Sequence, residues 1–573
     1  MTQPEAQLHQ VAFDKKLVSV WADTDHRYRN WPIVYVLDGS KSVYVGESLN
    51  VATRFRQHLD TDSKKSLTTA RVVVDDTFNK SVCLDLESWL IQMFGGDGVL
   101  KVLNRNEGIT NTNYYDRDAY QARFQDVFTS LKEAGLFRKS IAEIQNSSLF
   151  KLSPFKALTE DQRISVSEIV DSLFADLDEG GRSLTVIQGE PGTGKTVVAI
   201  YLMKLLADIK SSAADEPQDD VGLFSDFFTE GYAEQLADFT FGIVIPQQAL
   251  RKSVKGVFKK VPGLDPAMVL DPFGVGSRMT HFDLLIVDEA HRLSQRASQS
   301  SGPQNKRYGE INKSMFGEDS YERTQLDWIR ARSDHQILLV DAKQSVRPGD
   351  LPRTLIDTVI QNATTRGRFF RLKTQHRVTA GDDYVGYIRS VLAGEAPQPR
   401  SFPSYDLRFF DDVAEMESAI RAKEATYGLS RLVAGYAWKW ASKADPKAWD
   451  IAIGPHQYRW NTTLVDWIAS PSSIDEVGSI HTTQGYDLNY AGVIIGADLR
   501  YDPVTKRMAF DRANYFDARG KANNGMLGIT YTDDEILEYI RNIYAVLLTR
   551  GILGTFVYAC DPGLREYLRT YFS

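Results

Sequence analysis

The sequence predicts an α/β protein in which a small α+β unit precedes two larger parallel sheets covered by helices. From residue 155 onward, apolar runs such as 284–287 and 337–340 alternate with segments of helical periodicity. Continuous apolar strands of this kind belong to parallel sheets that are buried on both faces. Nearer the N-terminus, two β-branched runs, 33–37 and 42–46, flank the dipeptide Asp38-Gly39, which is a hairpin-turn signal.

The composition is that of a globular protein. The chain has 573 residues, 43% hydrophobic and 25% charged, which suggests roughly four folding units. Its two cysteines, Cys83 and Cys560, exclude a disulfide scaffold, and a reducing cytoplasm is the expected compartment. We expect no membrane span, because no apolar run reaches about 18 residues. The net charge of −8 argues against coating of nucleic acid by bulk positive charge, but it leaves a local basic groove open.

The sequence also predicts helices, one long loop and the domain boundaries. Val51, Phe55 and Leu59 recur at helical spacing, which predicts a helix over 50–59. The segment 211–238 is acidic and poorly periodic, and we interpret it as an insertion or loop. The predicted domains are a small α+β unit at 1–115, a helical linker at 116–154, a first parallel-sheet lobe at 155–355 and a second lobe at 356–573.

The strongest motif is the P-loop pattern at 189–196, which follows a predicted strand and precedes a predicted helix. Its glycines let backbone N–H groups surround phosphates, and the helix N-terminus adds partial positive charge. Lys195 is expected to reach the β- and γ-phosphates of ATP, and Thr196 to bind Mg²⁺. The predicted nucleotide-binding residues here are Gly189, Gly192, Gly194, Lys195 and Thr196.

Two carboxylates end a second apolar strand. Asp288 and Glu289 follow the run 284–287 directly. Asp288 is expected to hold the Mg²⁺ ion, and Glu289 to orient or deprotonate the attacking water. Such a pair alone is often a solvated strand end, but the upstream P-loop favours the catalytic interpretation.

With these motifs in place, residues 158–561 resemble a superfamily 1 helicase-type ATPase with two RecA-like lobes. More narrowly, the segments 433–438 and 549–551 resemble the helicase-like module of long Schlafen proteins. The resemblance implies that Gln162 contacts adenine and that Gln344 senses the γ-phosphate. It also implies that Arg377 and Arg550 are arginine fingers from the second lobe, which stabilise charge on the transferred phosphoryl group.

The same resemblance assigns the block 480–487. Gly485 and Asp487 are expected at the nucleotide, although Asp487 stands where many members carry Glu. His481, Thr482 and Thr483 are expected to contact the nucleic-acid backbone, and a structural role as polar residues at a strand end is the alternative. The tryptophans 438, 440, 449, 460 and 467 could stack bases or belong to the core.

The N-terminal unit resembles a GIY-YIG nuclease domain. The resemblance rests on the segments 33–35 and 44–46, with Ile33 in the place of the first glycine. It implies that Tyr35 or Tyr44 acts as the base, that Arg54 stabilises the phosphate and that Glu87 holds Mg²⁺ or Mn²⁺. Asn104 is expected to anchor the fold or the site. The predicted catalytic residues of this domain are Tyr35, Tyr44, Arg54, Glu87 and Asn104.

The sequence thus predicts a nuclease-helicase. ATP hydrolysis with Mg²⁺ would drive translocation on nucleic acid, with DNA favoured over RNA, and the nuclease domain would cut it. Fold-level analogy suggests defence of a bacterium against foreign DNA, with a homo-oligomer or defence-system partner proteins left open. The alternatives are a DNA repair or recombination nuclease-helicase and a nucleotide-gated switch without translocation.

Overall fold

The chain divides into two compact units. Residues 1–167, 200–238 and 254–266 form one unit, and residues 168–199, 239–253 and 267–573 form the other. The computed structural model describes residues 6–104, 114–212, 224–229, 231–297, 299, 301–341, 344–374, 381, 383–463, 467–483 and 487–572.

The first unit is built on a five-stranded sheet with the order β1-β4-β2-β3-β5. All neighbours pair antiparallel except β3 and β5, which are parallel. The predicted hairpin is confirmed, since β2 and β3 pair with Tyr35 opposite Gly46. The strands are β1 (Gln7–Ala12), β2 (Ile33–Asp38), β3 (Ser42–Ser48), β4 (Thr69–Val74) and β5 (Lys101–Val102).

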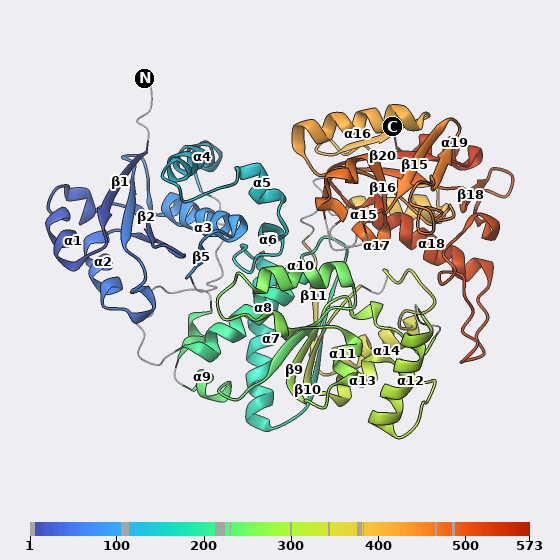
Figure 1. Cartoon of the computed structure of the whole chain (residues 1–573), viewed down its shortest axis with the longest axis horizontal. Helices are drawn as coiled ribbons and strands as arrows, with labels where there is room; N and C mark the ends of the chain where they lie inside the picture. Colours follow the sequence, from blue (N-terminus) through green and yellow to red (C-terminus); the bar gives the residue numbers. More distant parts are fainter. Residues whose placement is uncertain are drawn as a thin grey trace. The chain divides into compact units, whose positions relative to one another are not determined.

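Helices cover both faces of this sheet (Figure 1). The helices α1 (Lys15–Trp21) and α2 (Val51–Leu59) pack over the face that carries the β2 and β3 tyrosines. The long α3 (Lys80–Asp97) contacts β2 and β3 as well. Asn50 caps α2, because its side chain accepts a hydrogen bond from Thr53 N–H at 3.0 Å. The predicted helix over 50–59 is therefore confirmed.

Three further helices pack against α3: α4 (Arg117–Glu133), α5 (Ile141–Asn146) and α6 (Ser148–Lys151). The rings of Phe94 and Phe137 stack with centroids 4.2 Å apart. The buried carboxylate of Asp97 accepts a hydrogen bond from the backbone N–H of Lys139 at 3.0 Å. The segment predicted as a linker thus contributes core contacts to the first unit. The domain boundaries at 115, 154 and 355 stay predictions.

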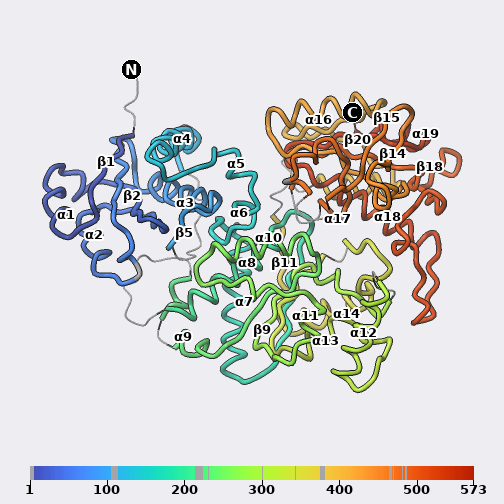
Figure 2. Tube along the Cα trace, in the orientation of Figure 1, coloured from blue at the N-terminus to red at the C-terminus, as the bar shows by residue number. Residues whose placement is uncertain are grey.

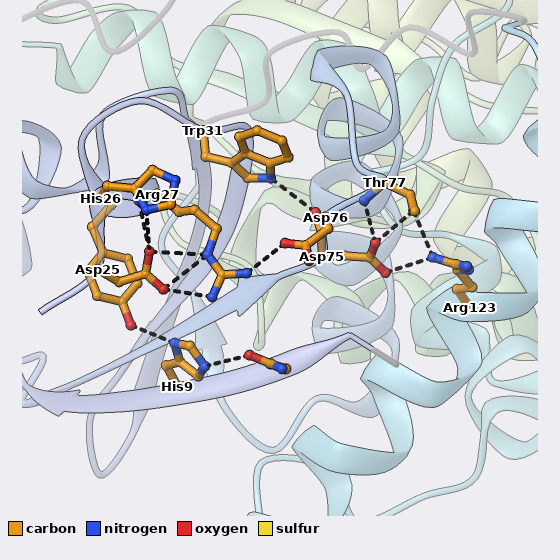
Figure 3. Close-up of polar contacts among 11 residues, drawn as sticks. His9, Asp25, His26, Arg27, Trp31, Asp75, Asp76, Thr77 and Arg123 are labelled. Atoms are coloured by element: carbon orange, nitrogen blue, oxygen red, sulfur yellow. Dashed lines mark hydrogen bonds and ion pairs between the residues drawn. The ribbon is translucent and has the colours of Figure 1, made fainter. Parts of the chain in front are cut away.

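A polar network fastens α4 to the loop after β4 (Figure 3). Arg123 on α4 donates to the buried Asp75 carboxylate at 2.8 Å and to the Thr77 hydroxyl at 2.7 Å. The Trp31 indole donates to the Asp75 carbonyl at 3.0 Å. A second pair, Arg27 with Asp25, forms beside it, and its hydrogen bonds lower the pKa of Asp25 to about 2. Loops from distant parts of the sequence are therefore held together by charge-assisted bonds.

The second unit contains two large sheets, as the sequence predicts. The first has the order β11-β6-β10-β9-β7-β8, and all its pairs are parallel. Its central strands β9 and β10 are almost wholly buried, which explains their continuous apolar sequence. The strands are β6 (Ser183–Gly189), β7 (Phe241–Val244), β8 (Val269–Leu270), β9 (Phe282–Val287), β10 (Ser333–Val340) and β11 (Phe369–Leu372).

The second sheet has the order β12-β20-β17-β13-β16-β15-β14. It is parallel except for the outermost pair, β14 with β15. A separate antiparallel ribbon joins β18 (Leu499–Asp502) to β19 (Arg507–Phe510). The strands of the sheet are β12 (Asp406–Phe409), β13 (Ser430–Ala434), β14 (Ile451–Ile453), β15 (His456–Trp460), β16 (Glu476–Ser479), β17 (Leu488–Ile495) and β20 (Gly551–Ala559).

The remaining helices connect and cover these strands. None of the helices in the described part of the chain has both the length and the apolar composition needed to cross a bilayer. The helices are α7 (Glu160–Glu179), α8 (Lys195–Ser211), α9 (Tyr232–Gln235), α10 (Gln248–Phe258), α11 (Pro272–Ser277), α12 (Gly302–Phe316), α13 (Gln325–Ala331), α14 (Arg353–Thr365), α15 (Asp383–Ala393), α16 (Val413–Tyr427), α17 (Ile480–Thr483), α18 (Asp533–Leu548) and α19 (Pro562–Arg569).

Candidate functional site

The P-loop connects β6 to α8. Gly192 and Gly194 have φ angles of +88° and +77°, in the left-handed region where a side chain would be strained. A Cβ atom on Gly189 would lie 2.3 Å from the Thr193 hydroxyl oxygen, so this glycine permits close packing of the loop. The buried Lys195 ammonium donates to the carbonyls of Gly189 and Glu190 at 2.7 and 3.1 Å. The loop is therefore shaped to surround a charged group with backbone amides and a lysine.

Asp288 lies at the end of β9 and is fully buried. Its carboxylate accepts hydrogen bonds from the Thr196 hydroxyl at 2.8 Å and from the Glu289 backbone N–H at 3.0 Å. Burial raises the pKa of Asp288 to about 7, and the neighbouring Glu289 carboxylate adds to the effect. A threonine hydroxyl 2.8 Å from a carboxylate offers the oxygen ligands that Mg²⁺ prefers. Thr196 and Asp288 would hold the ion, which would neutralise phosphate charge when bound.

Glu289 is held by a histidine that the sequence analysis did not single out. Its backbone is left-handed, with a φ of +51°, and such strain is common at functional sites. Its carboxylate lies 2.9 Å from Nε2 of the buried His291. The backbone N–H of Asp341 donates to Nδ1 of the same ring at 3.2 Å, which places the ring proton on Nε2, facing Glu289.

The surroundings keep Glu289 ionised. Burial opposes ionisation, but the contact with His291, followed by the charges of Lys195 and Arg292, holds the pKa of Glu289 below its usual range. A buried carboxylate that stays ionised and is fixed in orientation is suited to accept a proton from water.

Asp341, at the end of β10, completes the cluster. Its carboxylate lies 3.8 Å from the Lys195 ammonium and accepts a hydrogen bond from the Gln344 side chain at 2.7 Å. The P-loop, Asp288 and Asp341 thus meet at the carboxyl ends of three adjacent strands, β6, β9 and β10. In open parallel sheets, this is the edge where ligands bind.

The other predicted nucleotide residues are placed as follows. Arg550 is buried between the end of α18 and the start of β20, and Asp487 precedes β17 and is half-buried. Gln162 belongs to the first unit, where its side-chain oxygen accepts a hydrogen bond from Thr159 N–H at 3.0 Å. The predictions for Arg377 and Gly485 fall outside the described residues.

Thr482 and Thr483 are buried on the short helix α17. The Thr482 hydroxyl donates to the Asn461 side-chain oxygen at 2.7 Å, and the Thr483 hydroxyl donates to the Ser479 carbonyl at 2.8 Å. Their hydroxyls are therefore engaged within the chain, as the alternative of structural strand-end residues expects. Contact of these residues with nucleic acid stays a prediction, and the side chain of His481 lies outside the described residues.

The first unit contains a second cluster of polar side chains. Oη of Tyr35 and Nε2 of His58 lie 2.7 Å apart, and Nζ of Lys64 lies 2.7 Å from Nδ1 of the same ring. The Lys64 ammonium also lies 3.9 Å from the ring centroid of Tyr44, a cation–π distance. All four side chains are buried. The two predicted tyrosines are thus brought together around one histidine and one lysine.

The other predicted nuclease residues surround the same sheet. Asn104 is buried, and its amide bonds both backbone groups of Val45, at 3.0 Å to N–H and 2.7 Å to the carbonyl. This geometry fits the predicted anchoring role. Arg54 on α2 is half-buried and donates to Gln57 at 3.0 Å, and Glu87 on α3 is half-buried. In the described part of the chain, no group of three or more His, Cys, Asp or Glu side chains could hold a metal ion.

Comparisons with known proteins match the second unit best. A family model described as "Schlafen group 3, DNA/RNA helicase domain" matches residues 182–561, roughly two thirds of the chain. "Uncharacterized protein YPL245W" of Saccharomyces cerevisiae is 28% identical over 416 residues, which cover 67% of this chain and 84% of that protein. The solved "Sulfolobus solfataricus SWI2/SNF2 ATPase core in complex with dsDNA" is 11% identical and covers 69% of this chain and 87% of that one. Its TM-score of 0.23 supports no conclusion about this chain.

Proposed function

The chain belongs to the Schlafen group 3 DNA/RNA helicase-domain family, and we propose that it is an ATP-driven nucleic-acid motor joined to a GIY-YIG endonuclease domain. Family membership makes the second unit a helicase-like ATPase module. The observation that supports hydrolysis most strongly is the assembly of Lys195, Thr196, Asp288 and Glu289 at one edge of the first parallel sheet. The nuclease, the motor and the preference for DNA are parts of the proposal.

In the proposed ATPase reaction, the P-loop amides and Lys195 bind the β- and γ-phosphates. Glu289, ionised and held by His291, orients the attacking water and accepts its proton. Arg550, with Arg377, would stabilise charge on the γ-phosphoryl oxygens from the second lobe. Because the two lobes supply different groups to one triphosphate, hydrolysis would depend on their closure.

In the proposed nuclease, the His58 ring lies between Lys64 and Tyr35. A charged Lys64 can only donate, so its bond to Nδ1 leaves the His58 proton on Nε2, facing the Tyr35 oxygen. A hydrogen bond received in this way stabilises the phenolate and would make Tyr35 a better base. Tyr44 is 9% exposed whereas Tyr35 is fully buried, so Tyr44 remains the alternative base. Arg54 would stabilise the phosphate.

The metal of the nuclease is proposed at Glu87. A single half-exposed carboxylate fits Mg²⁺ or Mn²⁺, since Mg²⁺ keeps most of its waters when few protein ligands are present. When bound, the ion would stabilise charge on the leaving oxygen.

The motor is tested by the ATPase rate with and without single-stranded and duplex DNA and RNA. We expect at least one nucleic acid to raise the wild-type rate and Lys195→Ala to abolish hydrolysis. Unchanged rates with every nucleic acid would contradict the motor and leave the nucleotide-gated switch.

The nuclease is tested by nicking of supercoiled plasmid with Mg²⁺ or Mn²⁺. We expect Glu87→Ala to abolish nicking while leaving the ATPase rate unchanged. Tyr35→Phe and Tyr44→Phe separate the two candidate bases. Nicking by Glu87→Ala at the wild-type rate would exclude this site, and a lack of nicking by the wild type would leave a nuclease fold that only binds DNA.

The biological role is proposed by analogy of fold alone. If the chain defends a bacterium against foreign DNA, its expression should lower transformation by unmodified plasmid, and Lys195→Ala or Glu87→Ala should restore transformation. Equal transformation with the wild type and both variants would favour a repair role instead.

A further inference from the structure

The structure separates the five tryptophans of 438–467 into core and surface residues. Trp460 and Trp467 are fully buried, and the Trp467 indole donates to Glu476 at 2.9 Å. Trp438 and Trp440 are partly buried against the core cluster that contains Trp460. Trp449, in contrast, is 51% exposed. Packing in the core explains the presence of four of these tryptophans, but it does not explain why the fifth, Trp449, is exposed.

Trp449 lies two residues before β14, the outermost strand of the second sheet. In Figure 2, β14 is labelled beside β15, its antiparallel partner. The adjacent Asp450 is buried, its N–H donates to the Tyr458 carbonyl at 3.0 Å, and its carboxylate accepts from the backbone N–H groups of Ser442 and Trp460 at 2.7 and 2.8 Å. The backbone beneath the exposed indole is therefore fixed on both sides, so the ring is presented from a rigid base.

One cation contacts this indole, and three more are close to it in the sequence. The Arg459 guanidinium, on β15, lies 5.2 Å from the Trp449 ring centroid, a distance at which the cation attracts the ring face. Three exposed lysines, Lys439, Lys443 and Lys447, are carried by the loop that leads to β14. In the part of the chain that the structure describes, no ion pair joins any of these four side chains to a carboxylate. This loop thus carries three exposed lysines and one exposed carboxylate, Asp445, in a chain whose net charge is −8.

We propose that Trp449 and Arg459 form a stacking platform for one base of single-stranded nucleic acid, with the three lysines contacting the flanking phosphates. The proposal rests on the proposed function and adds a contact site to it. An exposed aromatic ring beside cations fits a base and its phosphates, because each base has a π-face and each linkage a negative charge. Such stacking tolerates any sequence, as a motor that moves along a strand requires.

The test measures binding of labelled oligo-dT and oligo-U, about 16 nucleotides long, to the full chain by fluorescence anisotropy. Trp449→Ala should raise Kd about 5- to 100-fold, and Trp449→Phe should retain most of the affinity. Tyr427→Ala is the matched control. Tyr427 is 44% exposed on the same lobe, but its neighbouring Lys423 is paired with Asp406 at 3.0 Å. We expect its Kd to stay within about twofold of the wild-type value, well below the effect of removing a stacked base.

The salt dependence of binding tests whether the three lysines contact phosphates. Replacing Lys439, Lys443 and Lys447 by Ala should lower the slope of log Kd against log salt by about 0.7 for each phosphate that these lysines neutralise in the wild type. An unchanged slope would remove the lysines from the platform.

The outcomes separate this inference from the proposed function. If the wild type binds a strand and Trp449→Ala binds it equally well, the platform is refuted while the motor stands. If the wild type binds neither strand, the platform is refuted, and the ATPase rates with duplex DNA and RNA then decide whether the motor stands. Thermal unfolding of Trp449→Ala at the wild-type temperature shows that the variant is folded.

Discussion

Removing the His291 imidazole should slow ATP hydrolysis without weakening ATP binding. The ring is buried, with Nε2 2.9 Å from the Glu289 carboxylate and Nδ1 3.2 Å from the Asp341 N–H. The contact of the imidazole with this carboxylate contributes at most about 3 kcal/mol, the upper value for a hydrogen bond to a charged group, and about 1.4 kcal/mol corresponds to a tenfold change in rate. His291→Leu should therefore lower kcat by up to about 150-fold and leave KM for ATP nearly unchanged.

Two conservative variants distinguish the contact of the His291 ring with Glu289 from its contact with the Asp341 N–H. The Asn amide reaches the position of Nδ1, so His291→Asn keeps the bond to Asp341 but is too short to reach Glu289. His291→Gln reaches the position of Nε2 and should recover most of kcat. Steady-state ATPase kinetics give kcat and KM, and thermal unfolding checks that each variant is folded. A His291→Leu enzyme that turns over at the wild-type rate, or His291→Asn outperforming His291→Gln, would refute the positioning of Glu289 by His291.

Three further predictions concern single residues. A Cβ on Gly46 would lie 2.3 Å from Oη of Tyr35. Gly46→Ala should therefore abolish plasmid nicking and leave ATPase activity intact, and nicking at the wild-type rate would exclude a role for Tyr35. Arg123→Ala leaves the buried Asp75 carboxylate without its 2.8 Å partner. It should lower the free energy of unfolding by about 3 kcal/mol, and adding Asp75→Asn should recover part of that free energy. Denaturant melts of the wild type and the two variants measure both changes. Burial raises the pKa of Asp498 to about 7, above its unfolded value of about 3.9. The folded state therefore binds the extra proton between these values, and stability falls as pH rises from about 4 to about 7. Asp498→Asn should flatten that fall in thermal melts, and an equal slope in both proteins would contradict the shift.

The phosphate-binding loop and the acidic strand end of the ATPase module could both be predicted from the sequence. The spacing of the glycines with Lys195 and the Asp-Glu pair after an apolar run are local patterns, because a phosphate-binding loop and a strand end are each built from consecutive residues. The hairpin at Asp38-Gly39 and the helix begun by Asn50 follow from turn and capping chemistry in the same way.

His58 shows where sequence alone was insufficient. Its place on the apolar stripe of α2, three residues after Phe55, was a signal of burial. Its partners, Tyr35 and Lys64, come from other segments, so the hydrogen bonds could not be read from spacing. The same holds for His291, whose ring is oriented by a backbone N–H from the neighbouring strand end.

The sequence by itself determined which residue types can bind phosphate and which segments become strands, because both depend on neighbours in the chain. Only the tertiary structure decided which histidine orients which carboxylate and which of five tryptophans is exposed to solvent. Those choices depend on how strands pair and pack, and residues far apart in sequence become neighbours only when the sheets form.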